Sequence, residues 1–299
     1  HISLNDANYR WLGGISPDRL RAVGDAIRAN DLFVEIDTSG TDPDHLIKLL
    51  DAARALGADR LRTYVTVRGS PEEKASTTVS GLRAAAPAAA DLGIAILLEN
   101  HEDFTGREVR RILEQVDHPS VGAVYDFGNS MMVLEDPMAA AQAMAPFVRS
   151  VHVKDQIVAV GRDRAEGADA TDAFVCGVPI GRGNIEIEPI LGYLLETTNL
   201  ERVCVQSVYG YRAPFTRNCR RLADAEARFP AFAQTALSPD ESICLGETEA
   251  LARIDPGRLL NYELSAVALG VGKVREILAN LGFRPGSSGQ RGKYEQDTR

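Results

Sequence analysis

Three short stretches of the chain share one arrangement, in which an apolar, β-branched run is followed at once by a polar, chemically active side chain. They are Leu98-Glu99-Asn100-His101, Tyr125-Asp126-Phe127-Gly128-Asn129 and Val151-His152-Val153-Lys154-Asp155. Glu99, Asp126 and His152 lie about 27 residues apart, which is the length of one strand–helix–strand repeat. We therefore expect successive parallel strands to deliver all three side chains to one edge of a sheet.

The rest of the chain continues this alternation of strands and helices. Strands are predicted at Leu32–Ile36, Leu61–Val67, Ile94–Leu98, Val121–Tyr125, Val148–Val153 and Arg202–Val205. Helical patterns between them cover Pro17–Ala29, His45–Leu56, Pro71–Leu92, a segment beginning at Thr105, Asp136–Ala145 and Ile187–Leu195. Strands that alternate with helices in this way indicate a parallel sheet with right-handed crossovers.

The strand count favours a barrel. The fragment His1-Ile2-Ser3-Leu4 reads as the end of one more strand. An eight-stranded (β/α)8 TIM barrel whose first strand and helix are missing from this chain fits the pattern better than an open sheet. A doubly wound sheet is the alternative, although no glycine-rich phosphate turn opens the first helix. The long interval between His152 and Gln206 contains residues 156–184, which we predict to be a loop over the active face.

The predicted domain organisation has three parts. Residues 1–234 form the barrel, residues 235–284 a C-terminal helical extension, and residues 285–299 a disordered tail without a periodic apolar face. Within the extension, two helical stretches are expected, Thr248–Ala252 with Arg258–Leu260, and Glu263–Leu281. We expect this extension to pack on the barrel or on a partner subunit.

Composition excludes several classes of protein. The 299 residues are 44% hydrophobic and 25% charged, with a net charge of −9, which argues against nucleic acid as the main partner. An apolar run long enough to cross a membrane is absent, and no secretory signal is visible. The four cysteines show no paired spacing, which is typical of reduced thiols in a cytoplasmic protein.

Two carboxylates and one imidazole at matching strand ends predict a metal site. Glu99 and Asp126 supply oxygen ligands and His152 supplies nitrogen, a set that suits Mn²⁺ best, with Mg²⁺ or Co²⁺ as alternatives and Zn²⁺ less suited. A single carboxylate at a strand end is more often a helix cap than a ligand. Three such groups at matching ends favour the metal interpretation.

As a set, these stretches resemble the sugar-phosphate isomerase/epimerase superfamily, the xylose-isomerase-like TIM barrels, over roughly residues 1–232. The matching positions are Glu99, Asp126, His152 with Lys154-Asp155, and the glycine turn Gly181-Arg182-Gly183-Asn184-Ile185. The resemblance implies a divalent metal centre and isomerase or epimerase activity on sugars. Residues 233–299 match no family pattern that we identify.

Gln206 departs from the family pattern, which has a glutamate after the last strand. Its amide oxygen can still bind a metal, so we expect Gln206 to be the fourth ligand. An amide has no proton to exchange near neutral pH, however, and cannot act as an acid or base. Inversion of a carbon by two bases on opposite faces is therefore disfavoured, whereas enolisation or β-elimination with one base remains open.

Further residues near these strand ends are candidates for catalysis or substrate binding, although each also has an ordinary structural interpretation. His101 is a candidate acid or base or a hydrogen-bonding residue, and Lys154 is a candidate to stabilise an enediolate oxygen or to pair with Asp155. The predicted substrate-binding residues are Arg212, Arg62, Asp155 and Trp11, and Glu35 and Asp37 also end an early strand and could line the same pocket.

The leading functional hypothesis is a divalent-metal-dependent enzyme that removes a proton from a carbon next to the carbonyl of a sugar or keto-sugar, in the manner of an isomerase or epimerase. The alternative is a lyase similar to inosose dehydratases or C-glycoside deglycosidases, with His101 or Glu99 as base. A metal-dependent DNA phosphodiesterase is disfavoured by the five histidines and the negative charge. An inactive scaffold is a third option. We expect a homo-oligomer, and the sequence leaves open a small partner subunit.

Overall fold

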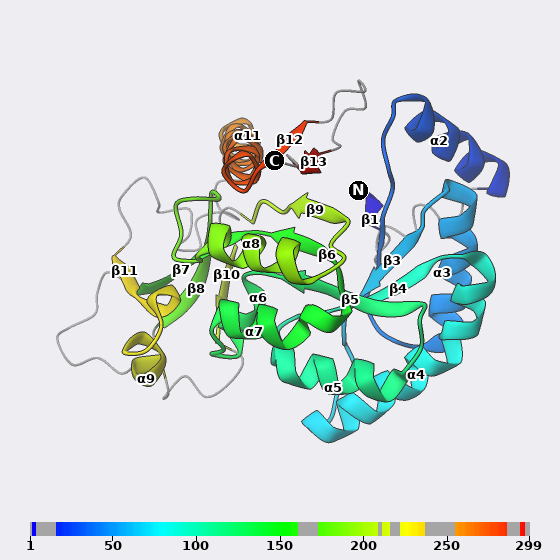
Figure 1. Cartoon of the computed structure of the whole chain (residues 1–299), viewed down its shortest axis with the longest axis horizontal. Coiled ribbons are helices and arrows are strands. Elements are labelled where there is room, and N and C mark those ends of the chain that lie inside the picture. Colours follow the sequence, from blue (N-terminus) through cyan, green and yellow to red (C-terminus); the bar gives the residue numbers. More distant parts are fainter. Residues whose placement is uncertain are drawn as a thin grey trace.

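Seven parallel strands form one curled sheet at the centre of the molecule, in the order β1-β2-β3-β4-β5-β6-β9 (Figure 1). This computed structural model describes residues 2–3, 16–160, 173–208, 211–215, 222–236, 255–285 and 294–296. The strands are β1 (Ile2–Ser3), β2 (Ile36–Asp37), β3 (Arg60–Thr63), β4 (Ala95–Glu99), β5 (Val121–Asp126), β6 (Val148–Val153) and β9 (Arg202–Val205). The parallel sheet and the short first strand agree with the predicted barrel.

Helices cover the outer side of this sheet (Figure 1). They are α2 (Pro17–Ala29), α3 (Pro43–Leu56), α4 (Pro71–Leu92), α5 (Gly106–Val116), the short α6 (Asn129–Met132), α7 (Pro137–Met144) and α8 (Ile187–Thr197). Their starts follow from the sequence, because a Ser, Thr or Asp side chain caps each of α2, α3, α4, α5 and α7. The predicted capping box at Thr105 is formed with Glu108.

The main hydrophobic core lies between the sheet and these helices. Side chains of alternate strand positions, such as Leu61, Ile96 and Val151, pack outward against helix residues such as Leu49 and Leu82. The predicted strand at Leu32–Ile36 is shorter in the structure, because only Ile36 joins the ladder while Leu32 and Phe33 are exposed. Since outward positions are apolar, the intervening positions on each strand face the inside of the barrel.

Residues 156–184 contain a β-hairpin, so the prediction that this segment is a loop is wrong. Strands β7 (Asp155–Val160) and β8 (Ala173–Val178) pair antiparallel, and β10 (Arg212–Pro214) and β11 (Gln234–Ala236) extend them to a second sheet. A small second core is formed by apolar residues of this hairpin, which are Ile157, Ala159, Phe174, Cys176 and Val178. Leu259 and Tyr262 pack against it. The Gly- and Asp-rich composition of the segment concealed these short apolar strands.

The C-terminal extension contains one long helix. Helix α11 (Pro256–Asn280) replaces the predicted pair of stretches, of which Thr248–Ala252 lies outside the described residues. The remaining elements are α9 (Leu222–Glu226), β12 (Phe283–Pro285) and β13 (Tyr294–Gln296). Because β12 and β13 pair antiparallel, the predicted disorder of the tail does not hold for these three residues of β13.

The oxidation state of the cysteines differs in part from the prediction. Cys176 is disulfide-bonded, so the prediction that all four thiols are reduced is wrong at this position, while Cys204 is a free thiol. Within the described ranges, none of the helices combines the length and apolar character needed to cross a membrane.

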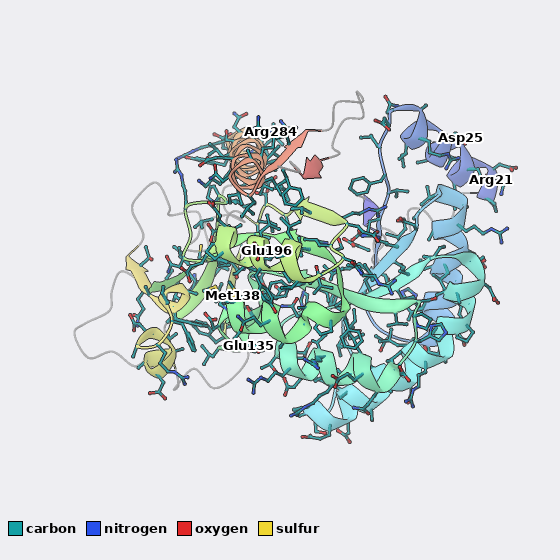
Figure 2. All side chains as sticks on the ribbon, in the orientation of Figure 1. Arg21, Asp25, Glu135, Met138, Glu196 and Arg284 are labelled. Atoms are coloured by element: carbon teal, nitrogen blue, oxygen red, sulfur yellow. The ribbon has the colours of Figure 1, made fainter. Side chains whose placement is uncertain are left out.

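A partly buried carboxyl group joins two of the outer helices. Glu135, labelled in Figure 2, precedes α7 and accepts a hydrogen bond of 2.7 Å from the backbone N–H of Gly106 at the start of α5. Burial raises the pKa of Glu135 from 4.5 to about 7, although the Gly106 hydrogen bond acts in the opposite direction. The folded protein therefore holds this proton more tightly than the unfolded chain does.

Replacing Gly81 tests how closely helix α4 approaches its neighbour. A Cβ atom on Gly81 would lie 1.9 Å from the backbone oxygen of Thr41, which no native contact allows. Gly81→Ala should lower the free energy of unfolding by about 1–3 kcal/mol through this overlap, measured by urea unfolding. Gly272→Ala in α11 is the control, because nothing lies within 4 Å there, and it should be neutral or slightly stabilising. Equal stability of both variants would contradict the close approach.

The partly buried Glu135 should make stability depend on pH. Because its folded pKa of about 7 lies above the unfolded value of 4.5, its contribution to stability is full below pH 4.5 and is lost as the pH rises to 7. Glu135→Gln should remove this loss, so the variant should gain stability relative to the wild type across that interval, measured by urea unfolding at several pH values. Glu114→Gln, which removes an exposed carboxylate paired with Arg110, should show no such trend.

Candidate metal centre

Glu99, Asp126 and His152 converge at the carboxyl ends of β4, β5 and β6. One ligand atom from each lies within 4.8 Å of the others, and each side chain is at most 2% exposed. Asp126 and His152 are direct partners in the β5–β6 ladder, and Glu99 ends the strand on the other side of β5. The structure therefore brings together the three residues that the sequence predicted as ligands.

Several of the side chains that point into the barrel are charged or polar. Arg62 lies beside Glu99, Ser150 lies two positions before His152, and Arg202 reaches Glu35 across the barrel. Such groups are buried at a cost unless they pair with opposite charges or hydrogen-bond partners. The barrel interior thus holds a network of compensating charges. The candidate ligands lie at the end of the barrel where the carboxyl ends of the strands meet.

Glu99 is held by two partners. Its Oε1 accepts a hydrogen bond of 2.9 Å from Asn129 Nδ2, and its Oε2 pairs with the guanidinium of Arg62. Burial acts to raise the pKa of this carboxyl, but Arg62 and His152 outweigh burial and lower it to about 2. Glu99 is therefore an anion at neutral pH, which suits a metal ligand and makes it a weak base.

Asp126 keeps one oxygen unused. Its Oδ1 accepts hydrogen bonds from the N–H groups of Gly128 (3.0 Å) and Asn129 (3.3 Å), and lies 3.3 Å from Lys154 Nζ. Its Oδ2 is buried and has no hydrogen-bond partner among the described residues. Burial raises the pKa of Asp126 despite the neighbouring Lys154. A cation at Oδ2 would supply the partner that this oxygen lacks and would favour the ionised carboxylate.

His152 lies between two carboxylates. Its Nε2 is 3.8 Å from Glu35 Oε1, and its Nδ1 is 4.0 Å from Glu99 Oε1. Burial acts to lower the pKa of the imidazole, but Glu35 and Glu99 together raise it. The two ring nitrogens therefore face different carboxylates, one on the metal side of the barrel and one deeper inside it.

Gln206 directly follows β9, on the same end of the sheet. Its backbone N–H donates to Val153 O at 2.9 Å, which places it next to the end of β6. Its Oε1 is buried and has no hydrogen-bond partner in the described part of the chain. An orphaned amide oxygen at this edge is compatible with the predicted fourth ligand.

His101 stacks on an aromatic ring at the mouth of the barrel. Its ring lies 4.1 Å from the ring of Tyr64, with an angle of 18° between the planes, and Arg62 Cζ lies 4.8 Å from the same Tyr64 ring. His101 is half-buried, so it keeps access to solvent. Arg62, Tyr64 and His101 therefore lie together beside Glu99, while the predicted roles of Arg62 in substrate binding and of His101 in catalysis stay predictions.

Lys154 and Asp155 are used within the protein. Lys154 Nζ donates to Asn129 Oδ1 at 2.5 Å and neighbours Asp126. Asp155 accepts hydrogen bonds from the backbone N–H groups of Gly181 and Gly183 at 2.8 Å each. A Cβ atom on Gly183 would lie 2.0 Å from Asp155 Oδ1, so the glycine lets the turn approach. These contacts argue against the predicted substrate contact of Asp155.

Of the two remaining predicted substrate residues, Arg212 and Trp11, the structure describes Arg212. Arg212 is on β10 of the second sheet, with its Cζ 4.1 Å from the ring of Phe174. The adjacent Tyr211 hydroxyl donates to Glu102, which links β10 to the loop that carries His101. Trp11 lies outside the described residues, so its predicted stacking on a sugar stays a prediction.

Comparison with known proteins identifies the family. Residues 37–205, more than half of the chain, match the model of the xylose isomerase-like TIM barrels. The chain belongs to this family. The matched span begins at Asp37 and ends with β9, so it contains Glu99, Asp126 and His152. The resemblance that the sequence motifs predicted is thereby confirmed.

Two curated relatives align with this chain over about half of their own length. An uncharacterized protein of Escherichia coli, YihM, is 27% identical over 157 residues, which are 52% of this chain and 48% of that protein. A 3-oxo-isoapionate decarboxylase of Pectobacterium atrosepticum is 29% identical over 151 residues, which are 50% of this chain and 54% of that enzyme. The chain therefore spans about half the length of the curated relatives it matches.

A solved structure of the same fold contains a metal. The crystal structure of the IOLI protein with a bound zinc atom has a TM-score of 0.56 and 13% identity, and covers 93% of this chain and 88% of that one. At this identity the likeness shows the fold alone. It places the seven-stranded sheet of this chain in the xylose isomerase-like barrel architecture.

Sequence reasoning missed two residues of this family member's site. Asn129 bridges Glu99 and Lys154, and Tyr64 carries the stacked His101. Asn129 follows Asp126 by three residues, in the stretch Tyr125-Asp126-Phe127-Gly128-Asn129, and this position next to a predicted ligand could have indicated its role. Tyr64 directly follows β3, but an aromatic residue at a strand end is equally common in hydrophobic cores, so the sequence alone gave it no role.

Asn129 should control metal affinity through Glu99. Removing its amide in Asn129→Ala frees Glu99 Oε1 and leaves Lys154 without one acceptor, so Mn²⁺ affinity should fall about 10–100-fold, measured by isothermal titration calorimetry. Asn184→Ala is the matched control, because its amide donates to Ala233 O away from the cluster. Unchanged affinity in Asn129→Ala would show that Glu99 does not need this support.

Proposed function

We propose that this protein is a divalent-metal-dependent enzyme that acts on a sugar or keto-sugar through an enediolate. The observation that carries the proposal is the convergence of Glu99, Asp126 and His152 ligand atoms within 4.8 Å. A half-buried imidazole, His101, lies on the adjoining wall. When bound, a divalent cation polarises a carbonyl and stabilises the negative charge that develops on its oxygen.

The donor set suits a hard or borderline cation. Glu99 and Asp126 offer carboxylate oxygens, His152 offers nitrogen, and Gln206 is the proposed fourth ligand through its amide oxygen. Mn²⁺ fits this set best, with Mg²⁺ or Co²⁺ as alternatives. The orphaned oxygens Asp126 Oδ2 and Gln206 Oε1 support the proposal, since buried polar atoms are otherwise paired.

His101 is the proposed acid or base. Glu99 has both oxygens engaged, and its pKa of about 2 makes it a poor proton acceptor. Stacking on Tyr64 holds the imidazole of His101 at the mouth, where it is able to take a proton from a substrate carbon or deliver one to a leaving group. Lys154, held by Asp126 and Asn129, positions those groups instead of reaching substrate.

The charge balance favours a negatively charged substrate or intermediate. Three carboxylates, Asp37, Glu99 and Asp126, surround the centre together with two cationic side chains, Arg62 and Lys154. Their sum is +2 − 3 = −1, and a divalent cation brings it to +1. An enediolate or a substrate carboxylate would neutralise this remaining charge.

A lyase is the second candidate function. Gln206 stands where the family pattern has a glutamate, so a second base is missing from the position that a two-base epimerase uses. Loss of CO₂ from a 3-oxo acid leaves an enolate without the need for a base, and β-elimination needs one base to form the enolate that then expels the leaving group. A relative of this chain bears the name of a decarboxylase of such an acid, which supports this candidate.

The proposed partners of the protein are a small-molecule substrate and further copies of the same chain. A small-molecule sugar or keto-sugar is the proposed substrate, and nucleic acid is disfavoured by the net charge of −9. We retain the homo-oligomer, with a small partner subunit as an option, as a proposal. The exposed apolar side chains Leu260, Leu264 and Val267 on α11 offer a surface for such contacts.

The reaction should be visible as deuterium exchange or product formation. Mn²⁺-loaded protein incubated with ketoses, inososes, 3-keto-sugars and 3-oxo sugar acids in D₂O should place deuterium next to a carbonyl or release an elimination or decarboxylation product, followed by NMR. His101→Gln should lower the rate about 10²–10⁴-fold with Mn²⁺ affinity unchanged. Glu99→Gln should instead weaken Mn²⁺ binding.

The outcomes separate the hypotheses. Formation of a deuterated isomer of the substrate favours the isomerase or epimerase, whereas an unsaturated product or CO₂ favours the lyase. A fully active His101→Gln variant would remove His101 from the chemistry. Absence of Mn²⁺ binding in the wild type would contradict the metal centre and would favour the scaffold hypothesis.

A further inference from the structure

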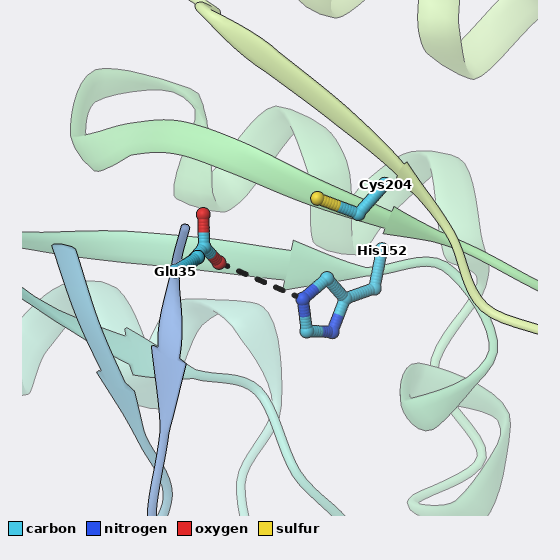
Figure 3. A group of neighbouring side chains, drawn as sticks. All are labelled: Glu35, His152 and Cys204. Atoms are coloured by element: carbon cyan, nitrogen blue, oxygen red, sulfur yellow. Dashed lines mark ion pairs between the residues drawn. The ribbon is translucent and has the colours of Figure 1, made fainter. Parts of the chain in front are cut away.

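Glu35 is a carboxylate buried inside the barrel, below the metal centre. It lies directly before β2, has 0% exposure, and its Oε1 faces His152 Nε2 at 3.8 Å. Figure 3 shows the carboxylate of Glu35 pointing at the imidazole ring, with the thiol of Cys204 on the neighbouring strand. The opposite ring nitrogen, Nδ1, lies toward Glu99.

Two neighbouring groups pair with the second oxygen of Glu35. Arg202 Nη1 lies 3.6 Å from Glu35 Oε2, and Ser150 Oγ donates to the same oxygen at 3.4 Å. Arg202 is itself held by Asp59 at 2.8 Å, so a chain of paired charges leads from Asp59 to His152.

The same group of residues is a poor second cation site. Glu35, His152 and Cys204 each offer a ligand atom within 4.8 Å of the others. Arg202 already neutralises Glu35, and its charge would repel a cation. Glu35 is therefore better suited to accept a proton-bearing nitrogen than to bind an ion.

We propose that Glu35 is a positioning residue: it accepts the Nε2–H of His152 and so presents Nδ1 to the cation beside Glu99 and Asp126. This inference rests on the metal centre proposed above. A neutral imidazole carries one proton, and a hydrogen bond at one nitrogen fixes the tautomer and the ring orientation at the other. The contact of 3.8 Å is longer than a hydrogen bond, and a slight rotation of the ring toward Glu35 would close it.

The first test reads the tautomer of His152 in the metal-free protein. Long-range ¹⁵N–¹H NMR of ¹⁵N-histidine-labelled protein at alkaline pH, where imidazole is neutral, should show His152 as the Nε2–H tautomer, assigned by its loss in His152→Gln. In Glu35→Gln the pattern should shift toward a mixture of tautomers. An Nδ1–H tautomer in the wild type would by itself overturn the proposal. This outcome does not depend on whether Glu35→Gln folds.

The second test measures Mn²⁺ binding by calorimetry. Glu35→Gln should weaken Mn²⁺ about 10–100-fold, whereas Cys204→Ser, next to the same ring, should stay within twofold of the wild type. Glu135→Gln controls for the loss of a partly buried carboxyl outside the barrel interior. Unchanged affinity in Glu35→Gln would overturn the proposal, and so would two Mn²⁺ ions per chain with the second lost in Cys204→Ser.

The two tests also separate this inference from the proposed function. If the wild type binds no Mn²⁺, the metal centre fails, while the tautomer spectrum still decides whether Glu35 orients His152. If Mn²⁺ binds tightly and Glu35→Gln leaves both readouts unchanged, the metal centre stands and the positioning role fails.

Discussion

The structure depends on the pairing of charges inside a barrel that apolar residues line on the outside. Strand residues alternate between the two sides, so the outward positions pack on helices and the inward positions carry Glu35, Arg62, Glu99, Asp126 and His152. Each buried charge would be costly alone. Contacts such as Arg62 with Glu99 and Arg202 with Glu35 compensate for this cost, and they also fix the direction in which each side chain points.

This compensation explains how the proposed metal centre is organised. Lys154 and the N–H groups after β5 occupy one oxygen of Asp126, and Asn129 and Arg62 occupy Glu99. Asp126 Oδ2 is left without a hydrogen-bond partner among the described residues. With a divalent cation bound, the charges around the site would sum to a positive value, which would suit an anionic enediolate or carboxylate.

The elements beyond the central sheet shape the mouth of the barrel. The β7–β8 hairpin follows β6 directly, and Asp155 at its start holds the glycine turn before α8. Tyr211 connects the second sheet to Glu102, close to His101. Variation in these segments changes the outline of the mouth without disturbing the ligands on the strands, as is general for TIM barrels. Substrate specificity in the proposed enzyme would therefore depend on these segments.

The sequence by itself determined the parallel sheet, the helix starts at capping residues such as Thr105, and the meeting of Glu99, Asp126 and His152, because strand periodicity and helix capping are local properties of the chain. It did not reveal the β7–β8 hairpin, the bridge through Asn129 or the stacking of His101 on Tyr64. The partnership of Glu35 with His152 joins residues 117 positions apart (152 − 35 = 117). Only the tertiary structure decided these pairings, because which buried charges become neighbours depends on how the sheet curls and which strands face each other across the barrel.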